Sequence, residues 1–330
     1  MIVSIDWLKE FVDIKESSGE LADILSSIGL EAEDSKPFED LEGVVIGKVK
    51  SVDKHPNADR LSVCSVYDGA KEFQVVCGAN NVAKGQTIAY AKVGSVLPGG
   101  FLLEKIKLRG VESSGMICSA KELNISDEHE GIMVLPESCI PGNDFVDEYG
   151  IKFLRIELDI TPNRPDAFSH YGVARDIAVY KNRPLSKIQF IEKKIQKKTG
   201  IKISVEDNID CPRYVGGLVK NVSVGPSPRW MQDRLIAAGQ RPINNLVDIS
   251  NFVLLEFGHP THIFDYDKLD NKEIYVRRAK KNESITTLDQ NKYKLNNNQL
   301  LITDGKSPIA LAGIMGGFDS AVDDGTINIL

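Results

Sequence analysis

Residues that could carry chemistry crowd into one short stretch, GHPTHIFDYDKL, from Gly258 to Leu269. Two histidines and two aspartates surround a proline and a phenylalanine there, and such a group could bind a metal, catalyse a reaction or cap a turn. His259 and His262 are three residues apart, a spacing that is the only support for a metal site. Pro260 between them disfavours a continuous ligand helix, and no cysteine or third histidine lies nearby. We therefore expect no bound metal.

A second polar group precedes an apolar run in QRPINNLVDISNFVLLEFG. Its members are Arg241, Asn244, Asn245, Asp248, Ser250 and Asn251. They could form a site, or the asparagines and Asp248 could cap a helix by satisfying backbone N–H donors. Taken alone, the pattern favours capping.

The glycines of AGIMGG form a third candidate. Gly313, Gly316 and Gly317 would let a ligand approach the backbone closely, or would only bend a strand. The motif lacks dinucleotide spacing and the Lys-Ser/Thr of a phosphate loop. The chain has no G-x-S-x-G elbow and no cysteine with an evident histidine partner, so a covalent hydrolase is disfavoured.

The composition is that of a soluble chain with two or three domains: 330 residues, 42% of them hydrophobic and 26% charged. The N-terminus resembles neither a signal peptide nor a membrane span, so a cytoplasmic location without membrane contact is expected. Five scattered cysteines without a C-x-x-C pair argue against a disulfide framework and a cysteine zinc site. The net charge of -7 means that nucleic-acid binding would need local basic patches.

Helices and short strands must position these groups. The first forty residues predict two helices, one capped by Ser4 and one opened by a capping box of Ser17 and Glu20 and closed by Gly29. The pair is too small to bury a core alone and must pack against a later segment. From about Leu41, alternating runs predict short strands that could close into an oligonucleotide-binding (OB) type barrel.

The rest of the chain shows further local patterns. Asp68-Gly69 predicts a hairpin turn within the strand region. A later helix, capped by Asp166 or Ser169, would bury one face and end near Asn182 and Pro184. The basic connector IEKKIQKKTGIK favours a solvated linker over phosphate contact. The third region predicts a strand YVGGLVKNVSV, a helix around PRWMQDRLIAAG that Gly239 stops, and strands around SPIALAGIMGG.

Several motifs, in this order, resemble the N-terminal part of bacterial phenylalanyl-tRNA synthetase beta subunits across essentially the whole chain. They are HPNADRLSVCSV, VVCGANNV, LRGVESSGMICSAKEL, LDITPNRPDAFSHYGVARDIA, RPINNLVDISNFVLLEFGHPTHIFDYDKL and IALAGIMGG. The barrel motifs alone also resemble free-standing tRNA-binding modules.

The resemblance implies an α+β multidomain fold. Residues 1–39 and 151–200 would form a small, discontinuous α/β N-terminal domain. Residues 40–150 would form the inserted OB-type tRNA-binding domain. Residues 205–330 would begin an α+β editing (B3/B4-like) domain, truncated at its C-terminal side.

The resemblance also implies a function. The beta subunit would pair with an alpha subunit in an alpha2-beta2 heterotetramer, support phenylalanine attachment to tRNA, and hydrolyse tyrosine from mischarged tRNA. A phenylalanine pocket rejects an isostere with an added hydroxyl only about a hundredfold, so a second, hydrolytic site is needed. The whole synthetase would use ATP and magnesium, and this fragment would hold no cofactor. The alternative is a noncatalytic tRNA-binding or structural subunit that uses the OB module.

Carried over by position, the resemblance implies an editing pocket of Arg241, Ser250, Asn251, His262 and Gly316, with His259 and Asp265 serving the turn. Serine stands at position 250 where the family usually has threonine. The glutamate that reads the tyrosine hydroxyl would lie past Leu330, so the fragment is expected to deacylate poorly. Salt-sensitive tRNA binding is expected from the barrel's basic residues, which are Lys48, Lys50, Lys54, Arg60, Lys105, Lys107 and Arg109.

Overall fold

Short strands outnumber helices in the computed structural model, which describes residues 1–35, 38, 41–126, 131–188 and 200–330. The helices of those residues are α1 (Ile5–Leu8), α2 (Ser18–Ser27), α3 (Phe145–Glu148), η1 (Gly150–Phe153), η2 (Pro165–Ala167), α4 (His170–Tyr180), α5 (Arg229–Ala237), α6 (Asn245–Phe257) and η3 (Tyr266–Lys268), where η marks a 3-10 helix. The strands are β1 (Ile2–Ser4), β2 (Glu31–Ser35), β3 (Glu42–Lys54), β4 (Ser62–Tyr67), β5 (Glu72–Cys77), β6 (Thr87–Leu97), β7 (Phe101–Leu102), β8 (Ile106–Leu108), β9 (Val111–Ser113), β10 (Met116–Ile117), β11 (Val134–Leu135), β12 (Arg155–Asp159), β13 (Ile203–Val205), β14 (Val219–Lys220), β15 (Ile274–Arg278), β16 (Ser284–Thr286), β17 (Lys292–Lys294), β18 (Leu300–Thr303), β19 (Pro308–Leu311), β20 (Met315–Gly316) and β21 (Asn328–Ile329). The predicted α+β class is therefore confirmed.

The chain divides into two units. Unit 1 comprises Met1–Lys187, Arg229–Pro242 and Leu255–Gly258, and unit 2 comprises Ile188–Pro228, Ile243–Leu254 and His259–Leu330. The predicted linker IEKKIQKKTGIK falls mostly on residues 191–199, which lie outside the described residues.

The caps predicted for the first two helices of unit 1 are present. Ser4 Oγ accepts a hydrogen bond from Trp7 N (3.3 Å) at the start of α1. Ser17 and Glu20 form a capping box at the start of α2, and Gly29 follows that helix with φ of +90°. Both helix predictions are confirmed.

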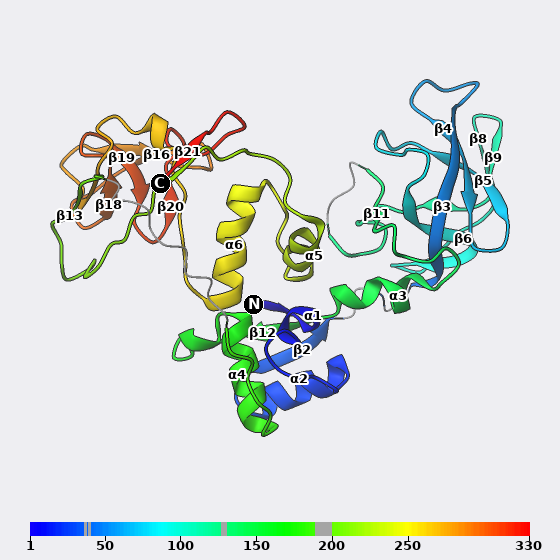
Figure 1. The fold of residues 1–330 in the computed structure, drawn as a ribbon, viewed down its shortest axis with the longest axis horizontal. Coiled ribbons are helices and arrows are strands. Elements are labelled where there is room, and N and C mark those ends of the chain that lie inside the picture. Colours follow the sequence, from blue (N-terminus) through cyan, green and yellow to red (C-terminus); the bar gives the residue numbers. More distant parts are fainter. Residues whose placement is uncertain (36–37, 39–40, 127–130, 189–199) are drawn as a thin grey trace. The chain divides into compact units, whose positions relative to one another are not determined.

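A later segment supplies the partner that these two helices need. Strand β12 lies between β1 and β2 and runs antiparallel to both, so segments far apart in sequence lie side by side (Figure 1). Helix α4 starts at Ser169, whose Oγ accepts from Gly172 N (3.0 Å), and Asn182 follows its end with φ of +50°. Of the two caps considered, Ser169 is the one used. The helix buries one face, as predicted, and that face includes Val173, Ala174, Ile177 and Ala178.

The strand region of unit 1 forms one antiparallel sheet in the order β10-β6-β3-β4-β5, with β7 and β11 also paired to β6. The β4–β5 hairpin turns at Asp68, whose Oδ1 accepts from Ala70 N (3.0 Å) and Lys71 N (2.9 Å), and at Gly69 with φ of +95°. The hairpin prediction is confirmed. The stretch IAYA of β6 is buried on both faces because separate apolar clusters pack on each side of the sheet, which explains why four apolar residues follow one another there.

Closure of this sheet into a barrel is not confirmed. Among the described residues no strand ladder joins β5 to β10. Single hydrogen bonds do connect β5 to the segment before β10, from Ser114 N to Gln74 O (2.8 Å) and from Val76 N to Ser113 Oγ (3.0 Å). The ends of the sheet are thus near each other without a regular pairing.

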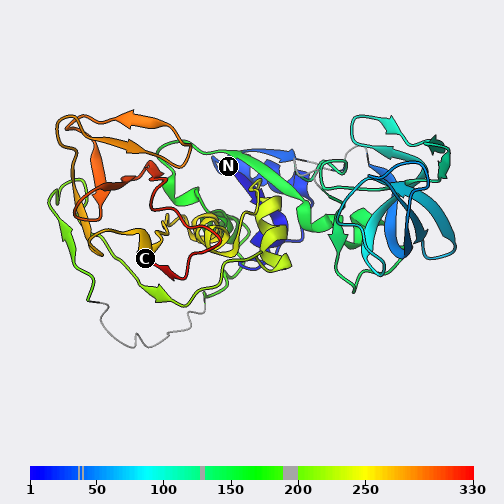
Figure 2. The same ribbon diagram turned by 90° about the horizontal axis from the view of Figure 1, so that it is seen from above.

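Unit 2 contains a five-stranded sheet in the order β13-β15-β18-β19-β20, in which only the β13–β15 pair is parallel. The yellow to red strands of this unit lie together in Figure 2. Its apolar core includes Phe264, Leu269, Ile274, Val276 and Ile309. Residues 245–254 of helix α6 and the pairs β14–β21 and β16–β17 complete the unit.

Of two predictions for the third region, the helix stop is confirmed and the strand is shorter than predicted. Helix α5 stops before Gly239, which has φ of +76°, as predicted. The strand predicted over residues 214–224 shrinks to Val219–Lys220, because Gly216 and Gly217 weaken a strand interior. Within the described parts of the chain, no helix combines the length and apolarity needed to cross a membrane.

Candidate functional site

A hollow of about 1220 Å³ in unit 2 contains the predicted histidine and glycine. Its walls come from three separated segments, which are residues 213–217, 259–264 and 313–316, together with single residues of the sheet. Phe264, Ala310 and Leu311 give it an apolar floor. Histidine, arginine and glycine backbone lie around this floor, an arrangement that suits an aromatic ligand with a polar end.

The ring of His262 packs against the backbone of Gly316. A Cβ added at Gly316 would lie 2.3 Å from His262 Cε1 and 2.6 Å from His262 Nε2, closer than carbon atoms approach without a shift. The ring of His262 also meets Phe264 edge to face, with 4.5 Å between ring centroids. The structure therefore brings these two predicted site residues together. It also explains why position 316 is glycine, since any side chain there would collide with the His262 ring.

The surroundings of His262 also change the pKa of its imidazole. The residue as a whole is exposed to solvent. Neighbouring atoms nevertheless desolvate the ring in part, and this desolvation lowers the pKa of the imidazole below its ordinary value. A lowered pKa keeps the imidazole neutral at pH 7. A neutral imidazole can accept a proton from water at one nitrogen and donate a hydrogen bond from the other.

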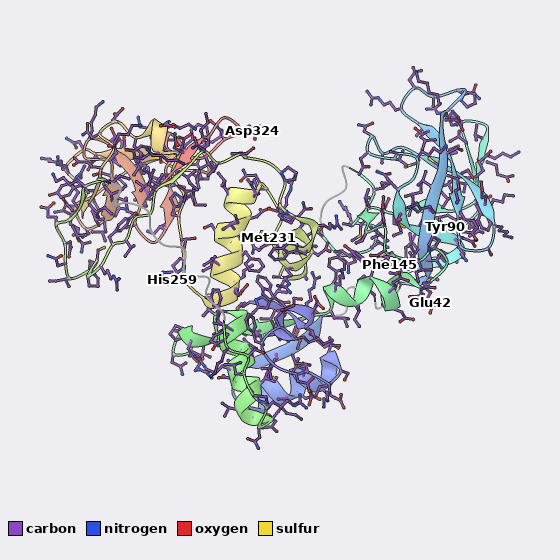
Figure 3. All side chains as sticks on the ribbon, viewed as in Figure 1. Glu42, Tyr90, Phe145, Met231, His259 and Asp324 are labelled. Carbon is purple, nitrogen blue, oxygen red and sulfur yellow. The ribbon has the colours of Figure 1, made fainter. Side chains whose placement is uncertain are left out.

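Ser250 holds the histidine loop without lining the hollow. Its Oγ donates to Thr261 O (2.9 Å) and lies 2.8 Å from Thr261 Oγ1, so α6 is tied to the residue before His262. Asn251, one position further along α6, is likewise absent from the described lining of the hollow. Figure 3 labels His259 near the end of α6, where the loop begins.

The polar group before α6 serves as a helix cap, as the pattern taken alone favours. Asn244 Oδ1 accepts from the backbone N–H groups of Leu246 and Val247, both at 3.1 Å. Asp248 is buried, and its carboxylate accepts from Ile243 N (2.8 Å) and Ser227 Oγ (2.6 Å). These contacts satisfy donors at the helix start.

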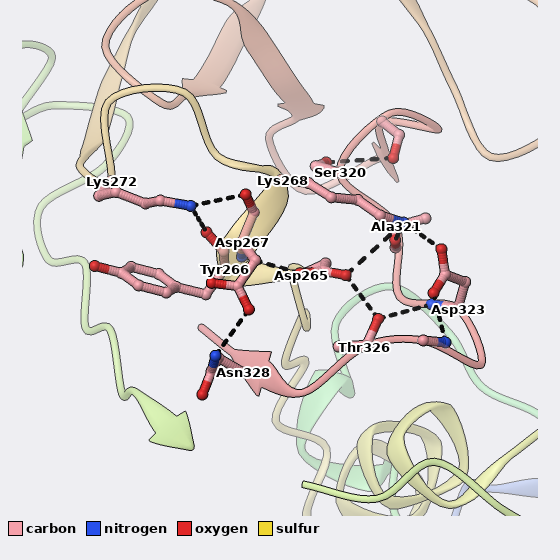
Figure 4. Close-up of polar contacts among 12 residues, drawn as sticks. Asp265, Tyr266, Asp267, Lys268, Lys272, Ser320, Ala321, Asp323, Thr326 and Asn328 are labelled. Carbon is pink, nitrogen blue, oxygen red and sulfur yellow. Dashed lines mark hydrogen bonds and ion pairs between the residues drawn. The ribbon is translucent and has the colours of Figure 1, made fainter. Parts of the chain in front are cut away.

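Asp265 anchors the chain just after the histidine, as predicted for a turn residue. Its carboxylate caps η3 through Asp267 N (2.9 Å) and accepts from Thr326 Oγ1 (2.7 Å), and its backbone N donates to Ser320 O (3.0 Å) (Figure 4). Lys268 extends the same network to Ala321 O and Asp323, each at 2.7 Å. The network fixes the segment that follows His262 against the chain near residue 326.

Two arginines line different hollows, and only one of them, Arg241, was named as a site residue from the sequence. Arg241 belongs to unit 1, where it lines a different hollow. Arg213 lines the His262 hollow of unit 2, although the sequence analysis did not single it out. The only local signal was its position before Gly216 and Gly217, and that spacing says nothing about distance from His262.

Some of the basic residues predicted to bind tRNA contact other residues of the sheet region in unit 1, and the others are exposed. Lys48 donates to Thr87 Oγ1 (3.2 Å), Lys50 lies over the Tyr67 ring (4.9 Å), and Lys105 pairs with Glu112 (2.5 Å). The remaining four are exposed: Lys54, Arg60, Lys107 and Arg109.

Two short segments carry these four residues and are joined directly. A His55 ring nitrogen lies 3.0 Å from Leu108 O, and Asn57 Nδ2 donates to Arg109 O (3.0 Å). The loop after β3 is thus fixed against the β8–β9 turn. This arrangement gathers exposed cations at one end of the sheet.

The cysteines and the potential metal-ligating side chains of the described residues form no second site of the kinds considered from the sequence. Cys64, Cys77, Cys118 and Cys139 are buried free cysteines, and burial raises the pKa of Cys64 to about 12. A thiol with so high a pKa is a poor nucleophile at neutral pH. Over the described residues, no three His, Cys, Asp or Glu side chains come together as a metal site would require.

Comparisons with known proteins give two domain matches. Residues 44–144 match the family model described as a putative tRNA binding domain, and residues 210–330 match the one described as a B3/4 domain. The second match covers both α6 and the His262 hollow.

The resemblance stated from the motifs is confirmed by curated relatives. The chain is 45% identical to the Phenylalanine–tRNA ligase beta subunit of Fusobacterium nucleatum subsp. nucleatum, covering 100% of this chain and 42% of that protein. It is 46% identical to the protein of the same name from Syntrophotalea carbinolica, covering 100% and 41%. The chain thus spans about two fifths of the length of these relatives. Among solved structures, the MetRS related protein from Pyrococcus horikoshii is 20% identical over 32% of this chain and 89% of its own, with a TM-score of 0.24, a likeness that carries no argument.

Proposed function

Because the whole chain matches part of phenylalanine–tRNA ligase beta subunits, we propose that it works within such a subunit and hydrolyses tyrosine from mischarged tRNA in the His262 hollow. The observation that carries this proposal is the contact of a desolvated His262 with a glycine backbone over an apolar floor. The floor would receive the aromatic ring of the amino acid. The ester would then lie near the imidazole.

The chemistry required is attack of water on an ester, which needs no covalent nucleophile. A neutral His262 would orient the water and accept its proton, while the developing oxyanion needs nearby N–H donors. The C–O bond between the carbonyl carbon and the terminal ribose would then break, and the proton would pass from His262 to the leaving ribose oxygen as tyrosine is released. Arg213 would supply a positive charge for a phosphate next to the terminal adenosine. Ser250 would act through the loop, because its hydroxyl holds Thr261.

The remaining parts of the proposal concern architecture and partners. The sheet of residues 44–144 would be an OB-type barrel inserted between residues 1–39 and 151–200, and residues 205–330 would begin the editing domain. The β12 pairing with β1 and β2, and the hydrogen bonds from residues 113 and 114 to β5, support this layout. An alpha subunit would complete an alpha2-beta2 heterotetramer that uses ATP and magnesium for aminoacylation in the cytoplasm.

A second function has one observation in its favour. Residues 44–144 match a putative tRNA binding domain, and four exposed cations gather at one end of its sheet. A noncatalytic tRNA-binding subunit would need nothing more than this. The two functions predict different hydrolytic behaviour.

The discriminating experiment is single-turnover deacylation of tyrosyl-tRNA and phenylalanyl-tRNA by the complete subunit assembled with its alpha partner. We expect selective hydrolysis of tyrosyl-tRNA, and His262→Ala should slow it by about 10- to 1000-fold, the range for loss of one positioning or oxyanion group. Thermal melts of the same variant separate this loss from unfolding. Equal, slow hydrolysis of both substrates by the unaltered protein would leave the binding function as the better account.

A further inference from the structure

A second hollow, of about 1120 Å³, lies within unit 1 and was not anticipated from the sequence. One wall comes from the region that matches the putative tRNA binding domain and includes Phe101 and Lys121. The opposite wall comes from the start of β12 and from the chain after α5, and it includes Arg155 and Arg241. Residues distant in sequence therefore place three cations around one space.

Arg155 is the most informative of the three cations. Its side chain is half-buried, desolvation lowers its pKa, and the Nε–H donates to the neutral Ser35 Oγ (3.2 Å). Within the described residues, neither Arg155 nor Lys121 nor Arg241 forms an ion pair. The charge of Glu157 opposes the effect of desolvation only in part, because the pKa of Arg155 is still lowered. Partial desolvation of a guanidinium is costly, and an anion supplied from outside would reduce that cost.

The carboxylate in the lining does not neutralise this group. Glu122 lines the hollow, but its carboxylate accepts from Ser119 N (2.5 Å) and Ser119 Oγ (2.7 Å) and so caps its own turn. Among the described residues, three cations and one carboxylate line the hollow. Positive charge thus exceeds negative charge among the described lining residues, and such an excess attracts a polyanion.

We propose that this hollow binds a phosphodiester of RNA through Lys121, Arg155 and Arg241. Arginine forks match phosphate oxygens in pairs, and a lysine adds a point charge, so the three can share one or two neighbouring phosphates. The exposed ring of Phe101 at the wall offers a face on which an adjoining base can stack. The choice of RNA rests on the proposed tRNA-binding function, because the matched domain supplies one wall.

The site is separate from the exposed cations near β8 and β9. Those residues are exposed, whereas Arg155 is half-buried and lines the hollow. RNA bound at both places would run along unit 1 and touch the matched domain as well as the chain after α5. In this arrangement Arg241, in unit 1, would bind a phosphate of the RNA backbone.

Binding of a fluorescent tRNA and of a 12-nucleotide single-stranded RNA tests the proposal, using the full chain at several salt concentrations. Lys121→Ala and Arg241→Ala should each weaken binding about tenfold, and each should lower the slope of log affinity against log salt by about 0.7 to 0.9. Arg155→Gln should do the same, with a thermal melt to confirm folding. Lys281→Ala, an exposed lysine of unit 2, is the matched control and should change neither quantity.

Inorganic phosphate provides the second arm. It should compete with RNA for the unaltered chain and lose that competition in the Lys121→Ala/Arg241→Ala variant. Tight phosphate binding combined with RNA affinity unchanged by the three substitutions would assign the hollow to a free anion and overturn the proposal. The result is independent of editing, because RNA affinity that falls with these substitutions supports the site even if tyrosyl-tRNA is not hydrolysed.

Discussion

Replacing Gly316 by alanine should displace His262 and slow tyrosyl-tRNA hydrolysis. The new Cβ would begin 2.3 Å from His262 Cε1, whereas carbon atoms pack at about 3.5 Å or more, so the ring must move by about 1 Å. A misplacement of that size costs about 100-fold in rate when the displaced group acts on the substrate. Gly316 has no left-handed φ, so the backbone itself tolerates alanine.

The same substitution should cost stability. Inserting a methyl group into an occupied space costs typically 1–3 kcal/mol, and we expect about 1 kcal/mol here because His262 is exposed on one side and can yield. For a domain of this size the melting temperature should fall by about 4 °C. Gly225→Ala is the matched control, because a Cβ there meets nothing within 4 Å and the residue does not line the hollow.

A double variant isolates the contact. Single-turnover deacylation and thermal melts should be run on Gly316→Ala, His262→Ala and the combination. If the clash with the ring is the cause, Gly316→Ala should cost almost nothing in the His262→Ala background, since the obstructing ring is gone. Equal losses of stability in both backgrounds, or full activity of Gly316→Ala, would refute the reasoning.

Four further outcomes can be measured. Arg213→Ala should weaken binding of adenosine 5′-phosphate esters in the His262 hollow about tenfold but leave the binding of adenosine without phosphate unchanged, as measured by calorimetry. Stability should fall between pH 6.5 and about 4, because buried His170 stays neutral in the folded state until its pKa of about 4 while the unfolded imidazole protonates near 6.5. On the order of 3 kcal/mol should be lost across this window, and pH-dependent urea unfolding of His170→Gln should show a smaller loss. Elemental analysis should find no stoichiometric zinc, and a chelator should leave the melting temperature unchanged; one zinc per chain would contradict our interpretation of the histidines. Lys54→Ala and Arg60→Ala should each reduce the salt slope of tRNA binding, whereas an affinity insensitive to salt would exclude an electrostatic role for that surface.

Features that depend on neighbours in sequence were predicted well. The caps at Ser4, Ser17 and Ser169 follow from side chains that reach backbone N–H groups two or three residues away. The stop at Gly239 follows from its left-handed φ. The capping interpretation of Asn244 was also correct, because an asparagine cap needs no distant partner.

Features that depend on distant chain segments were not predictable in the same way. Nothing local to Arg213 indicates that residues 213–217 form a wall beside His262, and nothing local to Arg241 indicates that it belongs to unit 1. Resemblance to a family supplied the names of site residues, but it gave no distances. The role of Ser250 likewise emerges only from its hydrogen bonds to Thr261.

The position of His262 is fixed by four separate parts of unit 2. Ser250 of α6 holds the residue before it, and Gly316 of β20 makes room for its ring. Phe264, two residues later, exchanges both backbone hydrogen bonds with Leu330, at 2.8 and 3.0 Å, and the Asp265 network fixes the following turn. A catalytic histidine that orients water gains its effect from fixed geometry, because it forms no bond that would correct a misplacement. If the proposed hydrolysis takes place beside His262, its rate should therefore depend on residues that never touch the substrate, and the polar network after His262 would contribute to it through the position of the ring.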